Sequence, residues 1–119
     1  VLVVEAEKSV LQAASFGYRN IVALGSCSLS EKQAQLLLQL NPKRIIMALD
    51  EGMDFEHIKR NLDLVESFAA FSSVKLLYWD TTKDEILKDT KNSPCDLGKD
   101  KFNEIMREQL VEYNRGNNE

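Results

Sequence analysis

The sequence has few of the residues that mark export, membrane insertion or disorder. Its 119 residues include five Gly, two Pro, two Cys and one His. So little Gly and Pro, beside 44% hydrophobic residues, excludes collagen-like, low-complexity and disordered chains. No apolar run approaches the ~20 residues of a membrane helix, and no signal-peptide pattern is present. We therefore expect a folded, cytoplasmic protein with no membrane association.

The cysteines, the single histidine and the net charge further restrict the functions that the sequence allows. Cys27 and Cys95 lie far apart without a CxxC spacing, so we expect reduced thiols. His57 falls early in a predicted helix, where an exposed position is expected, and one histidine supports neither a Ser/His/Asp nor a Cys/His arrangement. The net charge of −4 indicates a weak nucleic-acid binder when the domain is isolated.

The length predicts one domain, over residues 1–114, followed by a flexible tail at 115–119. Four nearly continuous apolar runs predict strands buried on both faces, which is typical of a parallel sheet. They lie at residues 1–4, 21–24, 45–49 and 74–79. Because the chain begins without Met and inside a strand pattern, we expect it to be a fragment of a larger protein.

Helical patterns separate the strands. The first covers about residues 8–16, with Val10, Leu11 and Ala14 at helical spacing. A capping box of Ser30 and Gln33 begins the second, and Pro42 forbids its continuation.

The third and fourth helices follow the later strands. The third helix begins at Asp54, a possible N-cap, and the last begins near Lys99 and includes Leu110 in its apolar stripe. A helical turn is possible around residues 85–87. The order predicts a three-layer α/β sandwich, Rossmann-like, with a four-stranded, mostly parallel sheet.

Acidic residues follow three of the four predicted strands. Glu5 follows the first, Asp50 and Glu51 follow the third, and Asp80 follows the fourth. Ligands bind outside the carboxyl ends of strands in such sheets, and converging carboxylates repel one another unless a cation lies between them. Mg²⁺ prefers oxygen ligands, so the pattern predicts a site for Mg²⁺ or Mn²⁺. For any one of these acids taken alone, a solvated loop position or a helix cap is the commoner role, and only their coincidence at several strand ends favours a metal site.

Two further residues are weaker candidates for phosphate contact. Lys8 lies in the first turn of the first helix, where a surface role is also compatible with the sequence. Gly25 follows the second strand and allows a tight turn before a helix N-terminus, whose amides suit an anion.

These residues together resemble the TOPRIM domain of bacterial and phage DNA primases. The resemblance rests on Val-Val-Glu5 after strand one, Gly25 after strand two and Ala-Leu-Asp50 after strand three. The segments Glu5-Ala6-Glu7-Lys8-Ser9 and Ser93-Pro94-Cys95-Asp96-Leu97-Gly98 are similar to the phage-type branch. Topoisomerases of types IA and II, small nucleases and recombination-repair proteins share the domain.

The resemblance implies a catalytic Glu5, acting as general acid or base or as a metal ligand, and an Asp-x-Asp that holds Mg²⁺. Asp50 matches the first aspartate, but Gly52 stands where the second belongs, which weakens the implied site. Glu51 or Asp54 are candidate substitutes. Asp96 resembles an acidic element that primases add after strand four, and is a further candidate metal ligand.

Three functions remain open at this point. The first is the metal-binding core of a primase, a nucleotidyltransferase of DNA replication that needs additional domains, single-stranded DNA and nucleotides. The second is an interaction module that has lost catalysis and docks to a helicase or another replication protein, for which Gly52 is the evidence. The third is a TOPRIM nuclease or topoisomerase fragment.

Overall fold

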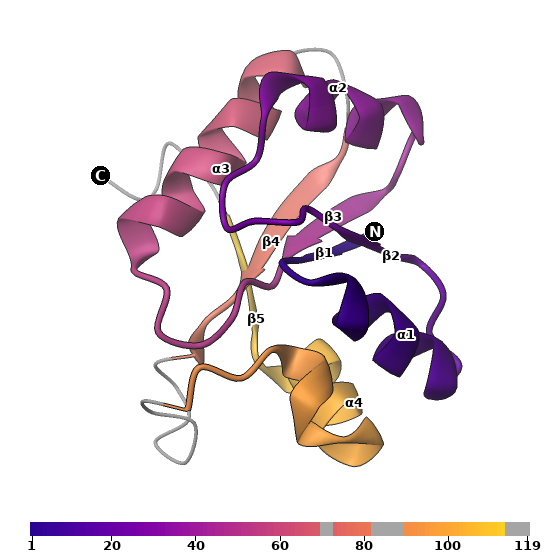
Figure 1. Cartoon of the computed structure of the whole chain (residues 1–119). Helices are drawn as coiled ribbons and strands as arrows, with labels where there is room; N and C mark the ends of the chain where they lie inside the picture. Colours follow the sequence, from indigo (N-terminus) through magenta and orange to yellow (C-terminus); the bar gives the residue numbers. More distant parts are fainter. Residues whose placement is uncertain (70–72, 82–89, 114–119) are drawn as a thin grey trace.

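The computed structural model of the protein contains a five-stranded sheet with helices on both faces (Figure 1). It describes residues 1–69, 73–81 and 90–113. The strands are β1 (Leu2–Val4), β2 (Ile21–Ala23), β3 (Arg44–Met47), β4 (Lys75–Trp79) and β5 (Leu110–Glu112). Their order across the sheet is β2-β1-β3-β4-β5. The predicted α/β class is confirmed, with one strand more than expected.

The first four strands are parallel, as their apolar sequences predicted. β1 pairs with β2 and β3, and β3 pairs with β4. β5 is antiparallel to β4, with Leu110 opposite Trp79. The prediction that Leu110 belongs to the last helix is therefore wrong. The open edge of β4 offers this segment backbone hydrogen bonds that a local apolar pattern does not reveal.

Helices connect the strands in the part of the chain that the structure describes. They are α1 (Glu7–Ser15), α2 (Glu31–Gln39), α3 (Phe55–Phe68), the 3-10 helix η3 (Pro94–Leu97) and α4 (Lys99–Glu108). Ser30 begins α2 through the predicted capping box, because its hydroxyl accepts from the Gln33 amide at 3.1 Å and its own amide donates to the Gln33 side chain at 3.0 Å.

The α1 helix buries a different face from the one predicted. Leu11 is 73% exposed, whereas Ser9 and Ala13 are buried. The Ser9 hydroxyl donates a hydrogen bond of 3.0 Å to Oγ of Ser93, the residue before η3. This buried contact, between residues distant in sequence, orients the helix and leaves Leu11 outside.

Two apolar cores, one on each face of the sheet, hold the layers together. Alternate strand residues point to opposite faces. Val3 packs in the core that includes residues of α2 and α3, whereas Leu2 and Val4 pack in the core that includes residues of α1 and α4. Figure 1 shows the same division, with α2 and α3 on one side of the sheet and α1 and α4 on the other. The three-layer sandwich is confirmed.

The strand order reverses between β1 and β3. The chain moves from β1 to β2 on one side, and later from β3 to β4 on the other side. Crossover connections therefore diverge above the carboxyl ends of these two strands, leaving a crevice where ligands bind in open α/β sheets.

Two predictions fall outside the described residues, namely the helical turn at 85–87 and the tail at 115–119. Within the described ranges, none of the helices has the length and apolar character that crossing a membrane requires.

Candidate metal centre

Glu5 and Asp50 meet at the carboxyl edge of the sheet. The strands that precede them, β1 and β3, are neighbours. The Asp50 backbone amide donates to Glu5 Oε1 at 3.2 Å. The Glu5 carbonyl accepts from the Gly25 amide at 2.9 Å, which joins the end of β2 to the same point. The two acids that carried the sequence prediction therefore lie together at the switch point between β1 and β3.

The Asp50 carboxylate occupies a poor environment for a negative charge. Its Oδ1 is buried and has no hydrogen-bond partner among the described residues. Burial first, and then the nearby charges of Glu5 and Asp96, raise the pKa of Asp50 from 3.8 to about 6, while Lys8 acts in the opposite direction. A buried acceptor without a donor is a destabilising feature that a cation would relieve.

The Asp96 carboxylate approaches this pair from η3 and is anchored by several groups. One oxygen accepts from the Ser93 amide at 3.0 Å, in a capping box that Ser93 Oγ completes. The other lies 3.2 Å from Lys8 Nζ and accepts from Gln12 Nε2 at 3.1 Å. Burial alone would raise the pKa of Asp96. The contacts with Ser93, Gln12 and Lys8 hold that pKa below its ordinary value.

Lys8 thus contacts a carboxylate in this structure. Its side chain is 69% exposed, and its charge acts on both Asp96 and Asp50. The suggested contact with phosphate stays a prediction.

Glu51 and Asp54 have structural partners. Glu51 is buried, and its Oε2 accepts from the Lys91 amide at 3.2 Å. The Glu51 amide donates to the Asn92 carbonyl at 2.8 Å, so this residue holds the segment that leads to η3. Asp54 caps α3 by accepting from the His57 amide at 2.8 Å, as the sequence suggested. Metal binding by either acid stays a prediction.

Two glycines shape the loops at this edge. Gly52 has a φ of +94°, and the nearest atom to an added Cβ would be Lys91 Cγ at 3.9 Å. Space is therefore available for a side chain, but the left-handed backbone disfavours one. Gly25 has a φ of +80°, also with open space around it, and its role as a phosphate cradle stays a prediction.

The donor set suits a hard cation with water ligands. A hollow of about 270 Å³ is lined by Glu5, Asp50, Glu51, Gly52, Met53 and Lys91. Across residues 1–69, 73–81 and 90–113, no three His, Cys, Asp or Glu side chains converge closely enough to form a metal cage. Mg²⁺ needs no such cage, because it commonly binds through one or two carboxylates and keeps several waters. The Glu5–Asp50 pair and the orphaned Asp50 oxygen fit that mode.

Sequence reasoning missed the residues that position Asp96. Gln12 lies four residues after Lys8 and on the same side of α1, so helical spacing could have linked them. The buried pair of Ser9 and Ser93 had no local signal. His57, expected to be exposed, is half-buried, and its Nε2 lies 3.1 Å from the Ser28 hydroxyl.

Asp80, the remaining strand-end acid, lies after β4, one strand farther from the switch point. Its amide donates to the Gln109 carbonyl at 3.4 Å.

This chain is similar to known proteins in both sequence and fold. The SPbeta prophage-derived uncharacterized protein YorJ of Bacillus subtilis (strain 168) is 32% identical over 126 aligned positions, which cover 92% of the chain and 32% of YorJ. The crystal structure of the Aquifex aeolicus primase (zinc binding and RNA polymerase domains) superposes with a TM-score of 0.70 and 24% identity, covering 95% of the chain and 26% of the primase. No family model matches the chain.

The chain matches only part of each of these longer proteins. The chain spans about a third of YorJ and about a quarter of the primase chain. At 24% identity the likeness to the primase establishes the fold alone, and this fold occurs in a primase. It therefore agrees with the architecture that the resemblance implied.

Proposed function

We propose that this chain is the metal-binding TOPRIM domain of a phage-type DNA primase. In the full-length protein the domain would act in metal-dependent nucleotidyl transfer, joining ribonucleotides on single-stranded DNA. The observation that carries this proposal is the meeting of Glu5 with Asp50 at the switch point, with Asp50 Oδ1 buried and unpartnered. The fold similarity to a primase and the similarity to a prophage-derived protein support it.

Glu5 and Asp50 would hold Mg²⁺ or Mn²⁺, with waters and substrate phosphate in the remaining positions. When bound, the metal supplies positive charge that offsets the charge of a nucleoside triphosphate. Glu5 is also the proposed general acid or base. Asp96 is the proposed further metal ligand. Gln12 and Lys8 hold its carboxylate, and its negative charge acts on Asp50.

Single-stranded DNA, nucleotides and a helicase are the proposed partners of the full-length protein. The chain covers a minor part of each similar protein, and we expect it to make few or no primers by itself.

Calorimetric titration of Mn²⁺ into the chain tests the metal site. We expect binding by the unmodified chain, and a loss of about tenfold or more in affinity for Asp50→Asn and for Glu5→Gln. Asp100→Asn, in the exposed first turn of α4, removes the same charge outside the pair and should leave the affinity unchanged. Equal losses in all three variants, or no binding by the unmodified chain, would contradict the proposal.

A second candidate is an interaction module of a replication protein without catalysis. The positive φ of Gly52 favours it, because this turn is built for glycine at the position where the resemblance implies a second aspartate. Under this alternative, millimolar Mn²⁺ would not bind, and Asp50→Asn would leave any partner binding intact.

A further inference from the structure

Four basic residues lie at the amino ends of the strands, at the edge of the sheet opposite the metal centre. Arg19 precedes β2, Lys43 and Arg44 begin the β3 segment, and Lys75 begins β4. All four are exposed. Arg44 and Lys75 are direct neighbours in the parallel register, and the Lys75 amide donates to the Lys43 carbonyl at 2.9 Å. Arg44 and Lys75 therefore occupy adjacent positions at this edge, and Lys43 precedes Arg44 in the chain.

None of these four cations has an ion-pair partner among the described residues. Elsewhere the chain does pair cations with acids, as in Lys8–Asp96, Lys59–Asp63, Lys101–Glu104 and Arg107–Glu108. Neighbouring like charges repel each other, so an unneutralised cluster is a site where an anion gains favourable electrostatic energy.

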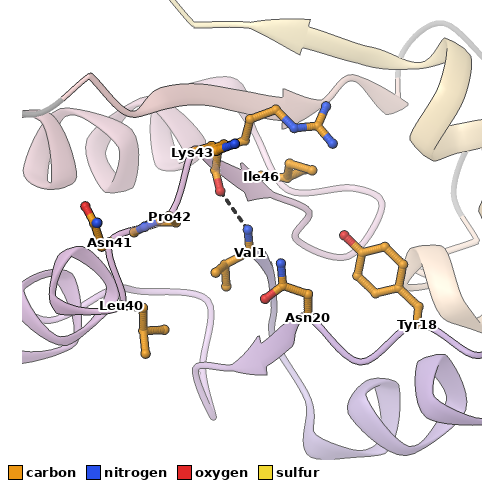
Figure 2. A pocket seen from close by; sticks show the side chains of 9 residues that line it. Val1, Tyr18, Asn20, Leu40, Asn41, Pro42, Lys43 and Ile46 are labelled. Atoms are coloured by element: carbon orange, nitrogen blue, oxygen red, sulfur yellow. Dashed lines mark hydrogen bonds between the residues drawn. The ribbon is translucent and has the colours of Figure 1, made fainter.

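A hollow of about 480 Å³ opens at this edge of the sheet (Figure 2). Of the four cations, Lys43 and Arg44 line the hollow. The other lining residues are Tyr18, Asn20 and Asn41 and the apolar residues Val1, Leu40, Pro42 and Ile46. Burial raises the pKa of the Tyr18 hydroxyl, and the positive charge of Arg44 opposes that effect. The guanidinium and the phenol are therefore close enough to interact electrostatically. Cationic, amide and aromatic groups are thus combined in one concave surface.

We propose that this amino edge binds the phosphodiester backbone of single-stranded nucleic acid. Lys and Arg side chains would contact successive phosphates, the amides would donate to phosphate or sugar oxygens, and Tyr18 would offer a face to a base. An acidic peptide would also be attracted to the charges and could accept hydrogen bonds from the amides. It would bring no nucleobase to the aromatic ring, and stacking on that ring is what favours a nucleic acid.

The distribution of charge supports this choice of edge. Glu5, Asp50 and Asp96 gather at the carboxyl edge, and that edge repels a phosphate backbone in the absence of a metal. The amino edge thus offers a positively charged surface on a chain of net charge −4. The inference does not depend on the proposed metal chemistry, because it uses none of the acidic residues.

Fluorescence anisotropy of a labelled oligothymidylate of about 16 nucleotides tests the surface, in low salt and with a chelator that removes divalent metals. The unmodified chain should bind, and Arg44→Glu should weaken binding about tenfold and reduce the salt dependence by at least about 0.7 in log–log slope, since one phosphate contact is lost. Lys75→Glu should have a similar effect. Lys32→Glu is the matched control, an exposed residue in the first turn of α2 with the same change of charge.

The controls separate the possible outcomes. Circular dichroism should show that the variants are folded. Equal weakening by Lys32→Glu and Arg44→Glu, absence of binding at low salt, or tighter binding of labelled polyglutamate than of the oligonucleotide would overturn the proposal.

Discussion

The backbone amide of Asp50 donates a hydrogen bond to the carboxylate of Glu5, although 45 residues separate them in the chain. This bond joins the carboxyl ends of β1 and β3 and brings two acids to one point of the sheet. It satisfies one oxygen of Glu5, whereas the buried Asp50 Oδ1 has no hydrogen-bond partner in the part of the chain that the structure describes. The charge at this site therefore depends on the protonation of Asp50, and its shape depends on the loop backbone at Gly52 and on η3, which carries Asp96.

Asp50→Asn should stabilise the protein at about pH 7 by about 1 kcal/mol, a value reduced for solvent screening because the carboxyl is partly exposed. The pKa of Asp50 is raised from 3.8 to about 6 in the folded state. Between these values the folded protein binds more protons than the unfolded protein, so stability falls as pH rises through this window. Near pH 4 the substitution should give little or no gain. Urea unfolding at both pH values measures the difference.

The control for this experiment is Asp100→Asn, an exposed residue in the first turn of α4, which should not stabilise the protein at pH 7. A stabilisation by Asp50→Asn that is equal at pH 4 and pH 7 would show that the charge of Asp50 is not its source.

Gly52→Asp should destabilise the protein by about 1 kcal/mol, because an L-residue must adopt the left-handed conformation at φ +94°. Gly52→Ala should cost at least as much, since Asp tolerates this region better than Ala does. Both free energies can be measured by urea unfolding. A neutral effect of both substitutions would mean that the loop rearranges at no cost, and would remove the backbone explanation for glycine at this position.

Ser93→Ala should cost about 1 to 2 kcal/mol, because it removes the cap of η3 and leaves the buried Ser9 hydroxyl without its acceptor. Hydrogen exchange should report faster opening of the Asp96 amide, which donates to both Ser93 Oγ and the Ser93 carbonyl and keeps only the carbonyl in the variant. Ser67→Ala is the matched control, because the Ser67 hydroxyl is exposed and bonds within its own helix to the Leu64 carbonyl. Similar losses for the two serines would contradict a role for Ser93 in holding η3.

Cys95 should react with a thiol reagent far more slowly than Cys27 in the folded protein. Burial, and then the charge of Asp96, raise the pKa of the Cys95 thiol to about 11, so almost none is thiolate at neutral pH. Cys27 is half-buried, and neither cysteine forms a disulfide in the structure. Ellman's reagent should therefore show one fast thiol, which Cys27→Ser removes. Addition of guanidinium should expose the second, whereas a fast reaction in folded Cys27→Ser would contradict the prediction.

Local sequence signals determined most of the architecture. The capping box of Ser30 and Gln33 and the N-cap at Asp54 mark helix starts that the structure reproduces, because such hydrogen bonds span three residues and need no distant partner. Near-continuous apolar runs identified the four parallel strands for a similar reason, since burial on both faces leaves few polar residues in them. The acids at the ends of these strands then followed directly.

Contacts between distant segments decided the rest. Leu110 joined the sheet because β4 had an open edge, and α1 turned Leu11 outward because Ser9 bonds to Ser93. In the same way, the sequence placed Glu5 and Asp50 at strand ends, but only strand order made them neighbours. The burial of one Asp50 oxygen and the pairing of Asp96 with Lys8 depend on packing between elements, and no short sequence pattern carries that information.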